Sequence, residues 1–321
     1  MSVNRDKPDR WKADIARSVD MYNEWFMNFA PKAFRETRVQ TTEDVKNTLE
    51  ATDNLTNIRP EVLRRNPGVL PTLRMSTCPP LARDRLIGLA GVPKSMIERM
   101  ERKNKLPVRL TNAKLDEELR KIGSIIEKLA DRDIFTWLDG ERAPTESEVY
   151  RAATIVADRL CGATANPIIR NAQEDRQLKR IGAWLDMQGY RRLPLESGVK
   201  FSEMPPGTYS FRLNVPVKQE DNGEKAVNIS VDIVIMRRMD EPGDLPLLVE
   251  AKSAGDFTNV NKRRKEEAKK MEQLRRTYGE KVEYVLFLCG YFDSGYLGYE
   301  AAEGLDWMWE HRIDDLAEFG V

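Results

Sequence analysis

Three charged residues stand in two short apolar segments of this 321-residue chain, at a spacing that could do chemistry. Asp232 lies within the apolar run 226–236, and Glu250 and Lys252 close the run 245–252. Two carboxylates can hold a hard cation such as Mg²⁺, and an ammonium beside them can position or activate an attacking water. Charged groups rarely enter apolar segments without a use. The pattern therefore predicts metal-dependent hydrolysis of phosphodiester bonds in nucleic acid.

Both apolar segments are predicted to be β-strands, joined by a polar segment with a turn at Pro242-Gly243. The first strand alternates, so we expect Asp232 on one face and an apolar set on the other: Val227, Ile229, Val231, Ile233 and Ile235. The same period of two places Glu250 and Lys252 on one face of the second strand. The hairpin would bring the three charged side chains onto one shared face.

An aspartate in one strand and a Glu-x-Lys in the next also occur together by chance, so the surrounding elements matter. Upstream, the segment 168–188 has helical spacing after Asn166-Pro167 and carries Glu174 as a candidate further carboxylate; its neighbour Asp175 could face inward instead. Downstream, a basic helix is predicted over 262–278 and a buried central strand over 282–289. This order predicts an α/β fold, with a mixed β-sheet core flanked by helices.

The first part of the chain is expected to be mainly helical. An apolar stripe from Trp11 to Phe29 recurs at three- and four-residue steps, in a helix that Pro31 should end. The residues 41–44 can cap another helix that runs to Leu49. A turn at 139–144 marks a domain boundary. We therefore expect a helical N-terminal region over 1–143 and a nuclease domain over 144–321.

Two segments are candidates for contact with DNA. Residues 81–103 fit a helix-turn-helix, whose second helix would present Lys94, Ser95 and Arg99, although helix–glycine–helix corners are equally common in plain helical packing. The segment after the second strand must lie near the cut bond, and its polar and basic side chains suit base edges and phosphates. These candidates are Ser253, Thr258, Asn259, Asn261, Lys262 and Arg263. Asn259 and Asn261 could instead only cap the following helix.

Composition excludes several other classes of function. Fifty-two Lys and Arg balance fifty-two Asp and Glu, but the charges are segregated, with nine basic residues against four acidic ones between 259 and 281. One histidine and three widely spaced cysteines argue against histidine-based hydrolases, zinc sites and disulfides. No apolar run is long enough to cross a membrane, and the N-terminus does not resemble a signal peptide, so we expect a cytoplasmic protein.

Longer stretches of the sequence carry a family resemblance. The helix with Glu174, the strand with Asp232, and Glu250-Ala251-Lys252 before a basic helix resemble the PD-(D/E)-x-K nuclease superfamily, which has the restriction-endonuclease-like fold. The strings MSTCPPLARDRLIGLAGV, EAKSAGDFTNVNKRRKEEA and CGYFDSGYLGYEAAEGLDWMWEHRIDDL resemble the XamI family of type II restriction endonucleases, and the likeness covers nearly the whole chain. One departure is Val231, where the superfamily pattern has a proline that shapes the strand and binds no metal.

The resemblance implies Mg²⁺-dependent double-strand cutting of DNA at a short palindromic site, with a DNA methyltransferase as the functional partner that protects the host. Asp232 and Glu250 would hold the metal, and Lys252 would sit beside the attacking water. Two alternatives stay open: a repair or junction-resolving nuclease of the same fold, and a non-catalytic helix-turn-helix regulator, which would leave Glu250 and Lys252 without a purpose.

A homodimer is the simplest assembly for an enzyme that cuts both strands of a palindrome with one active site per subunit. Apolar side chains for such a contact are available between Trp11 and Phe29 and around the aromatic residues Tyr296, Tyr299, Trp307 and Trp309. Both patches could equally be buried within one subunit.

Overall fold

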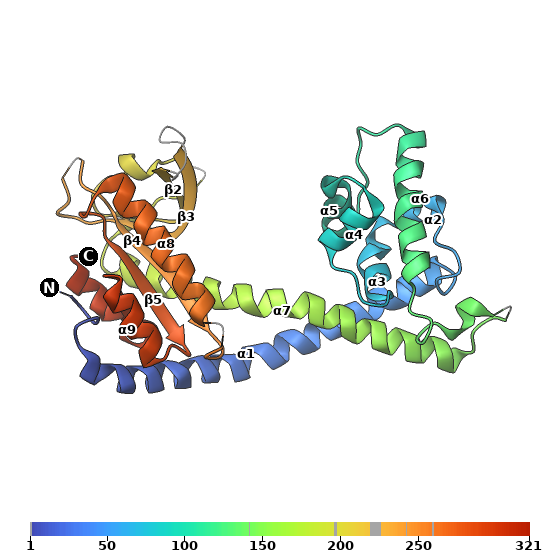
Figure 1. Ribbon diagram of the computed structural model, residues 1–321, viewed down its shortest axis with the longest axis horizontal. Helices are drawn as coiled ribbons and strands as arrows, with labels where there is room; N and C mark the ends of the chain where they lie inside the picture. The colour runs from blue at the N-terminus through green and yellow to red at the C-terminus, as the bar shows by residue number, and fades with distance from the viewer. Residues whose placement is uncertain (1, 141, 196–197, 219–225, 242, 259) are drawn as a thin grey trace. The chain divides into compact units, whose positions relative to one another are not determined.

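A computed structural model gives the fold (Figure 1). It describes residues 2–140, 142–195, 198–218, 226–241, 243–258 and 260–321, with the side chains of 260–264 outside this description. The chain forms two compact units: a sheet unit, Met1–Phe29 with Arg170–Val321, and a helical unit, Ala30–Ile169. The expected division at 143 and 144 falls within the helical unit, and as a statement about domains it stays a prediction.

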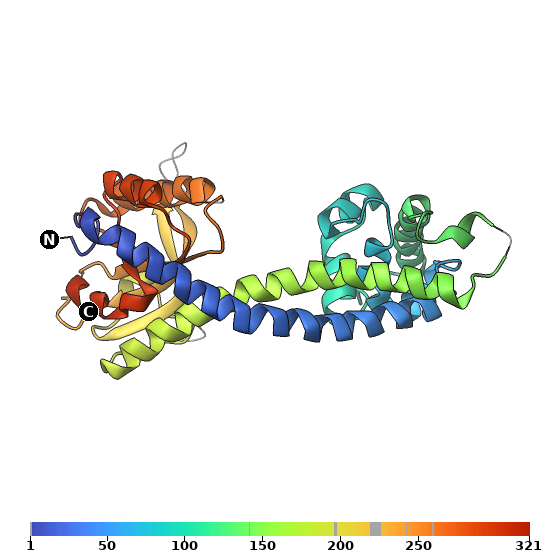
Figure 2. The same cartoon turned by 90° about the horizontal axis from the view of Figure 1, so that it is seen from below.

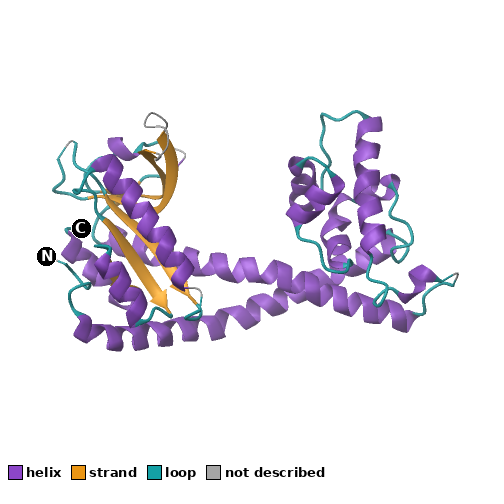
Figure 3. Cartoon of the chain, viewed as in Figure 1, coloured by secondary structure: helices purple, strands orange, loops and turns teal. Residues whose placement is uncertain are grey.

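The predicted fold class, a mixed α/β chain with a helical N-terminal region, is confirmed (Figure 3). The α-helices are α1 (Pro8–Ala51), α2 (Pro60–Arg65), α3 (Leu70–Met75), α4 (Arg83–Ala90), α5 (Lys94–Lys103), α6 (Asn112–Leu129), α7 (Glu146–Met187), α8 (Val260–Tyr278) and α9 (Ser294–Ala302). The 3₁₀ helices are η1 (Pro67–Val69), η2 (Thr136–Asp139), η4 (Phe201–Glu203) and η5 (Glu310–Phe319). The strands are β1 (Arg191–Arg192), β2 (Thr208–Lys218), β3 (Ala226–Met236), β4 (Leu247–Ala254), β5 (Tyr284–Gly290) and β6 (Asp306–Trp309).

The six strands form one mixed sheet in the order β1-β2-β3-β4-β5-β6. β2, β3 and β4 are antiparallel neighbours, whereas β4, β5 and β6 are parallel, which requires α8 and α9 as crossover connections. The end of α7 covers one face of the sheet, and α8 and α9 cover the other (Figure 2). The hairpin expected at 221–223, between β2 and β3, lies outside the described residues.

The alternation predicted for the first strand is wrong at its centre. Ile233 and Ile235 of β3 pack with α7, whereas Val231 joins the core on the opposite face, beneath α8 and α9. In β2 the same change of face separates Phe211 from Leu213. Both changes occur at Arg212 and Asp232, which lie between the paired residues Phe211–Ile233 and Leu213–Val231, and Arg212 has a left-handed backbone with φ 53°. A left-handed residue interrupts the pleat, so the period of two does not continue across it.

Two predicted helix boundaries are also wrong: Pro31 was expected to end one helix, and Asn166-Pro167 to precede another. α1 continues through Pro31, and α7 continues through Pro167. A proline inside a helix removes one backbone hydrogen bond and costs roughly 3 kcal/mol, so packing elsewhere along the helix must offset it. In α1 this packing includes Tyr22 in the sheet unit and Val45 in the helical unit, both of which are buried. Local sequence rules do not contain that tertiary contribution.

The helical unit has its own core and contains the predicted helix–turn–helix segment. α4 ends at Gly91, whose φ of 61° suits glycine, and α5 begins at Lys94. Its interior is formed by aliphatic side chains such as Leu70, Leu86 and Met96, all fully buried. Among the described helices, none combines the length and the apolar character that crossing a bilayer would require.

The aromatic residues considered for a subunit contact lie largely inside the chain. Trp307 and Trp309 are fully buried and Tyr296 nearly so, and Trp11 of α1 packs edge-on against Trp307 at 5.4 Å between ring centroids. Phe26 and Met27 of α1 are exposed. The C-terminal aromatic patch is therefore core of the sheet unit and offers little surface to a partner.

Candidate active site

The candidate site lies where β3 and β4 separate. Only three residue pairs join these strands, ending at Ile233 and Val249, whereas β4 stays paired with β5 as far as Ala254. Asp232 and Glu250 are the next residues after the last pair. In place of a β3 carbonyl, the Asp232 Oδ2 atom accepts the backbone N–H of Ala251 at 2.9 Å. The fork thus brings the two predicted carboxylates together.

Lys252 lies on the same face of β4 as Glu250, as the period of two predicts. Its Nζ atom is 3.1 Å from the Glu250 Oε1 atom. A second ammonium, Lys270 of α8, donates to the same oxygen at 2.5 Å and lies 3.5 Å from the carbonyl oxygen of Ser230. Glu250 is only 4% exposed, so these charges interact in a medium that screens them poorly. The basic helix after the second strand therefore contributes directly to the site.

Glu267 of α8 completes the cluster, and sequence reasoning did not identify it. Its side chain is fully buried, its Oε1 atom is 3.2 Å from the Lys252 Nζ atom, and its Oε2 atom accepts the hydroxyl of Tyr296 at 2.9 Å. The sequence does indicate that Glu267 faces the core, because this residue lies on the same helical stripe as Met271 and Leu274. We call Asp232, Glu250, Lys252, Glu267 and Lys270 the carboxylate–lysine cluster.

The electrostatics of this cluster favour an added cation. Three carboxylates face two ammonium groups, which leaves one negative charge uncompensated when all are ionised. Burial, and then the charge of Glu250, raise the pKa of Asp232 to about 6, although the Ala251 N–H and Lys252 act in the opposite direction. The Oε2 atom of Glu250 is buried without a hydrogen-bond partner among the described residues.

The pKa values of the lysine and of its second carboxylate are also displaced. Burial alone would lower the pKa of Lys252, but Glu250 and Glu267 outweigh it and raise that pKa, so the side chain is a stable ammonium. Burial raises the pKa of Glu267, partly offset by Lys252 and by the hydroxyl of Tyr296. Lys252 is therefore held as a proton donor and a positive charge between two carboxylates.

A divalent metal fits the residues that are present. Mg²⁺ is typically bound by one or two protein carboxylates, with water and substrate phosphate completing its shell. Asp232 and Glu250 supply those oxygens. A bound cation would give the unpartnered Glu250 oxygen a partner and would lower the raised pKa of Asp232. Within the described ranges, no three His, Cys, Asp or Glu residues converge as a complete protein-only metal site.

Glu174 is placed differently from Asp232 and Glu250. It lies on α7 beside Asp175; Glu174 is half-buried, Asp175 is exposed, and both bind the guanidinium of Arg212. The charge of Glu174 contributes to the raised pKa of Asp232, so it acts on the site through space. The buried polar side chain of this part of α7 is Gln177, whose Nε2 atom donates to the carbonyl oxygens of Lys252 and Phe287 at 3.3 and 3.0 Å.

Comparisons with known proteins agree with this chemistry. The profile of the XamI restriction endonuclease family matches residues 53–309. The chain belongs to the XamI restriction endonuclease family. The resemblance inferred from the sequence is confirmed, and the protein is a site-specific nuclease that acts on DNA.

Two further similarities have very different weight. The nuclease is 52% identical over 321 residues to Type II restriction enzyme SalI of Streptomyces albus G, an alignment that covers 99% of this chain and 100% of that enzyme. A crystal structure of protein VC1899 from Vibrio cholerae aligns with 90% of this chain and 55% of that chain. Its identity of 14% and TM-score of 0.28 are too low to carry an argument.

The predicted DNA-contacting residues of this XamI-family nuclease fall into three groups. Lys94 and Ser95 are exposed in the first turn of α5, and Arg99 is half-buried. Ser253 is half-buried at the end of β4, whereas Thr258 is exposed and its backbone N–H donates to Asp256 at 2.8 Å. The other candidates, Asn259 and the side chains of Asn261, Lys262 and Arg263, lie outside the described residues.

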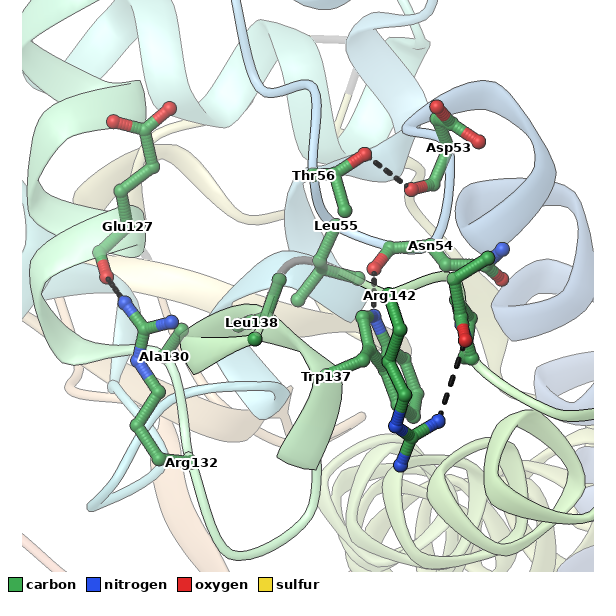
Figure 4. Close-up of a pocket in the computed structure, with 13 residues that line it drawn as sticks. Asp53, Asn54, Leu55, Thr56, Glu127, Ala130, Arg132, Trp137, Leu138 and Arg142 are labelled. Atoms are coloured by element: carbon green, nitrogen blue, oxygen red, sulfur yellow. Dashed lines mark hydrogen bonds between the residues drawn. The ribbon is translucent and has the colours of Figure 1, made fainter.

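The helical unit of the nuclease contains a cavity of about 700 Å³ (Figure 4). The Nε1 atom of Trp137 donates to the carbonyl oxygen of Asn54 at 2.9 Å, and Arg132 donates to the carbonyl oxygen of Glu127 at 3.3 Å. The charged side chains that line the cavity are all exposed: Asp53, Glu127, Arg132 and Arg142. We call it the charged cavity. Since none of these charges is buried, it lacks the environment that prepares a group for catalysis.

Proposed function

We propose that this nuclease is a type II restriction enzyme that makes double-strand cuts at a short palindromic DNA sequence, with Mg²⁺ as cofactor. The observation that carries the proposal is the fork at which Asp232, Glu250 and Lys252 meet. The 52% identity to Type II restriction enzyme SalI supports the type of cutting. Because its substrate would be DNA that enters the cell, we expect it to act in the cytoplasm beside a methyltransferase that protects the host.

The proposed chemistry assigns a role to each residue. Asp232 and Glu250 would hold the metal, which supplies Lewis-acid charge to the phosphate and acidifies a bound water. Lys252 would orient the attacking water and offset the negative charge that develops on the phosphate. Burial of Glu250 excludes bulk water from this side of the site. Glu174 would be an additional carboxylate, acting on Asp232 through its charge.

DNA contact is proposed for the polar and basic residues on both units. On the helical unit, within the proposed N-terminal region 1–143, these residues are Lys94, Ser95 and Arg99. On the proposed nuclease domain, 144–321, they are Ser253, Thr258, Asn259, Asn261, Lys262 and Arg263. A homodimer is proposed because its two-fold symmetry would match that of a palindrome. Sedimentation velocity with and without DNA tests the dimer.

Digestion of phage DNA tests the proposed function. Purified protein is incubated with the DNA in Mg²⁺ and, as the matched control, in EDTA. We expect discrete fragments only with Mg²⁺, and sequencing of the fragment ends should return one palindromic site and the position of the cut. Fragments formed in EDTA would contradict the metal dependence. Metal-dependent cutting without a common end sequence would favour a structure-specific nuclease instead.

A further inference from the structure

Arg212 has an unusual backbone at an informative position. It lies in the middle of β2, between Phe211 and Leu213, which pair with Ile233 and Val231 of β3, so it falls at the level of Asp232; its φ is 53°. Residues other than glycine seldom adopt a left-handed conformation inside a strand, because the Cβ atom crowds the backbone. Glycine would take this conformation without strain, so an arginine here indicates that its side chain has a use.

The side chain of Arg212 is held by one edge only. Its Nε and Nη2 atoms donate to the Glu174 Oε1 atom at 3.1 and 2.8 Å, and Nη2 also donates to the Asp175 Oδ1 atom at 3.0 Å. Within the part of the chain that the structure describes, no hydrogen bond uses its Nη1 atom. The side chain is 49% exposed. The two carboxylates therefore orient the guanidinium while leaving donors for another ligand.

Arg212 also lines a small cavity that is rich in positive charge. The cavity has a volume of about 270 Å³, and Lys179, Arg192 and Arg212 face one carboxylate, Asp175, among otherwise apolar lining residues. The guanidinium of Arg192 stacks on the ring of Phe211 at 4.7 Å, which limits its rotation. Three cations face Asp175 in the cavity and Glu174 beside it, so one positive charge is in excess, and a half-apolar recess with this excess favours a compact anionic ligand.

We propose that this cavity binds a phosphate group of the DNA backbone next to the phosphodiester that is cut, with Arg212 and Arg192 as its ligands. The proposal rests on the proposed function, because DNA is the anionic substrate that reaches Asp232. Arg212 falls between the β2 residues that pair with Ile233 and Val231, the two neighbours of Asp232, so its side chain begins close to the proposed metal-binding carboxylate. The planar fork of an arginine suits phosphate oxygens, and Glu174 and Asp175 would hold it ready.

The substitution Arg212→Gly separates this role from folding. Glycine removes the guanidinium and relieves the left-handed strain, so we expect an unchanged or higher Tm by circular dichroism. Binding to a fluorescein-labelled random-sequence duplex in EDTA should weaken about tenfold, and the slope of log K against log salt should fall by about one. Cleavage of plasmid DNA in Mg²⁺ should slow at least about tenfold.

Two further variants complete the test. Arg191→Ala is the matched control, because Arg191 is exposed on the same short strand as Arg192 but does not line the cavity; its salt slope and cleavage should equal those of the wild type. Arg192→Gln should also reduce the salt slope, and it serves as the test variant if Arg212→Gly does not fold.

The outcomes distinguish this inference from the proposed function. Wild-type salt slope and cleavage in Arg212→Gly would overturn the phosphate site while leaving the nuclease function intact. A lower Tm without a change in salt slope would assign Arg212 a structural role and also overturn the inference. If the wild-type protein cuts no DNA in Mg²⁺, the proposed function fails, whereas the salt slopes in EDTA still report on the phosphate site.

Discussion

The carboxylate–lysine cluster of the sheet unit and the charged cavity of the helical unit both place carboxylates near basic side chains, but only the first buries them. Glu250 and Glu267 are 4% and 0% exposed, whereas Glu127 and Arg142 at the cavity are open to solvent. At the cavity, the exposed Arg142 binds the half-buried Glu148 and, with bonds from Thr145, holds the pKa of Glu148 far below its usual range. A pair with one partner open to solvent is screened and contributes little.

The comparison shows that size and charge alone do not mark a functional site. The charged side chains at the cavity are exposed to solvent, so none of them needs a ligand to offset burial. In the cluster, burial raises the pKa of Asp232 and one negative charge remains uncompensated. A buried excess of charge is unfavourable for folding and is retained where it serves binding or catalysis.

Removal of a carboxylate should greatly reduce cleavage in the cluster and have no effect on cleavage at the charged cavity. Asp232→Asn and Glu250→Gln should each reduce cleavage of phage DNA by about a thousandfold or more, because the proposed metal loses a ligand. Glu127→Gln, a matched substitution at the charged cavity, should leave cleavage unchanged. Initial rates in Mg²⁺ measure both. Wild-type activity in Asp232→Asn would show that the fork is not the active site.

Removal of the second partner of Lys252 should have an intermediate effect. Glu267→Gln keeps the size of the side chain but removes the charge that helps to raise the Lys252 pKa. We expect cleavage to fall by about tenfold to a hundredfold and the alkaline limb of the pH–rate profile to move to lower pH. Tyr296→Phe, which removes the hydroxyl that donates to Glu267, should have a smaller effect in the same direction.

The shape of the pH–rate profile tests whether Glu267 acts through the lysine. A loss of rate with an unmoved alkaline limb would mean that Glu267 does not set the Lys252 pKa. Glu148→Gln provides the control from the helical unit, where neither the rate nor the profile should change.

The smallest expected effect concerns stability in the absence of metal. The folded-state pKa of Asp232 is about 6, above the ordinary value of 3.8 for an aspartate, so the folded state binds this proton more tightly than the unfolded state. Its contribution to stability is therefore lost as pH rises from about 4 to above 6. Asp232→Asn keeps an acceptor for the Ala251 N–H and removes the charge. In EDTA at pH 7.5 the variant should be more stable than the wild type by about 2 kcal/mol, with little difference near pH 4.

Glu148→Gln should behave in the opposite way, which sharpens the contrast. The pKa of Glu148 is lowered, so its charge stabilises the fold at neutral pH and that contribution is lost on acidification. Denaturant unfolding of both variants at pH 4 and pH 7.5 measures the two signs. If Asp232→Asn is less stable than the wild type at pH 7.5, the half-buried aspartate is not under electrostatic stress.

Much of the fold and of the candidate site follows from local sequence patterns. The strand at 226–236 has the predicted bounds, and Glu250 and Lys252 share a face of β4 as the period of two requires. The basic helix also forms close to its predicted range. These features depend on local backbone geometry and apolar periodicity, which the residues of each segment determine by themselves.

Other features were decided by tertiary structure, because they depend on contacts between distant residues. Pro31 and Pro167 should interrupt helices by local rules, but packing along α1 and α7 offsets their cost. The apolar residues of β2 and β3 change from one face of the sheet to the other at Arg212 and Asp232. Arg212 has a left-handed backbone there, which no propensity of arginine predicts. Glu267 reaches Lys252 only because α8 folds back across β4. The sequence alone therefore determined which residue types could do the chemistry, and the packing of the sheet determined which of them meet.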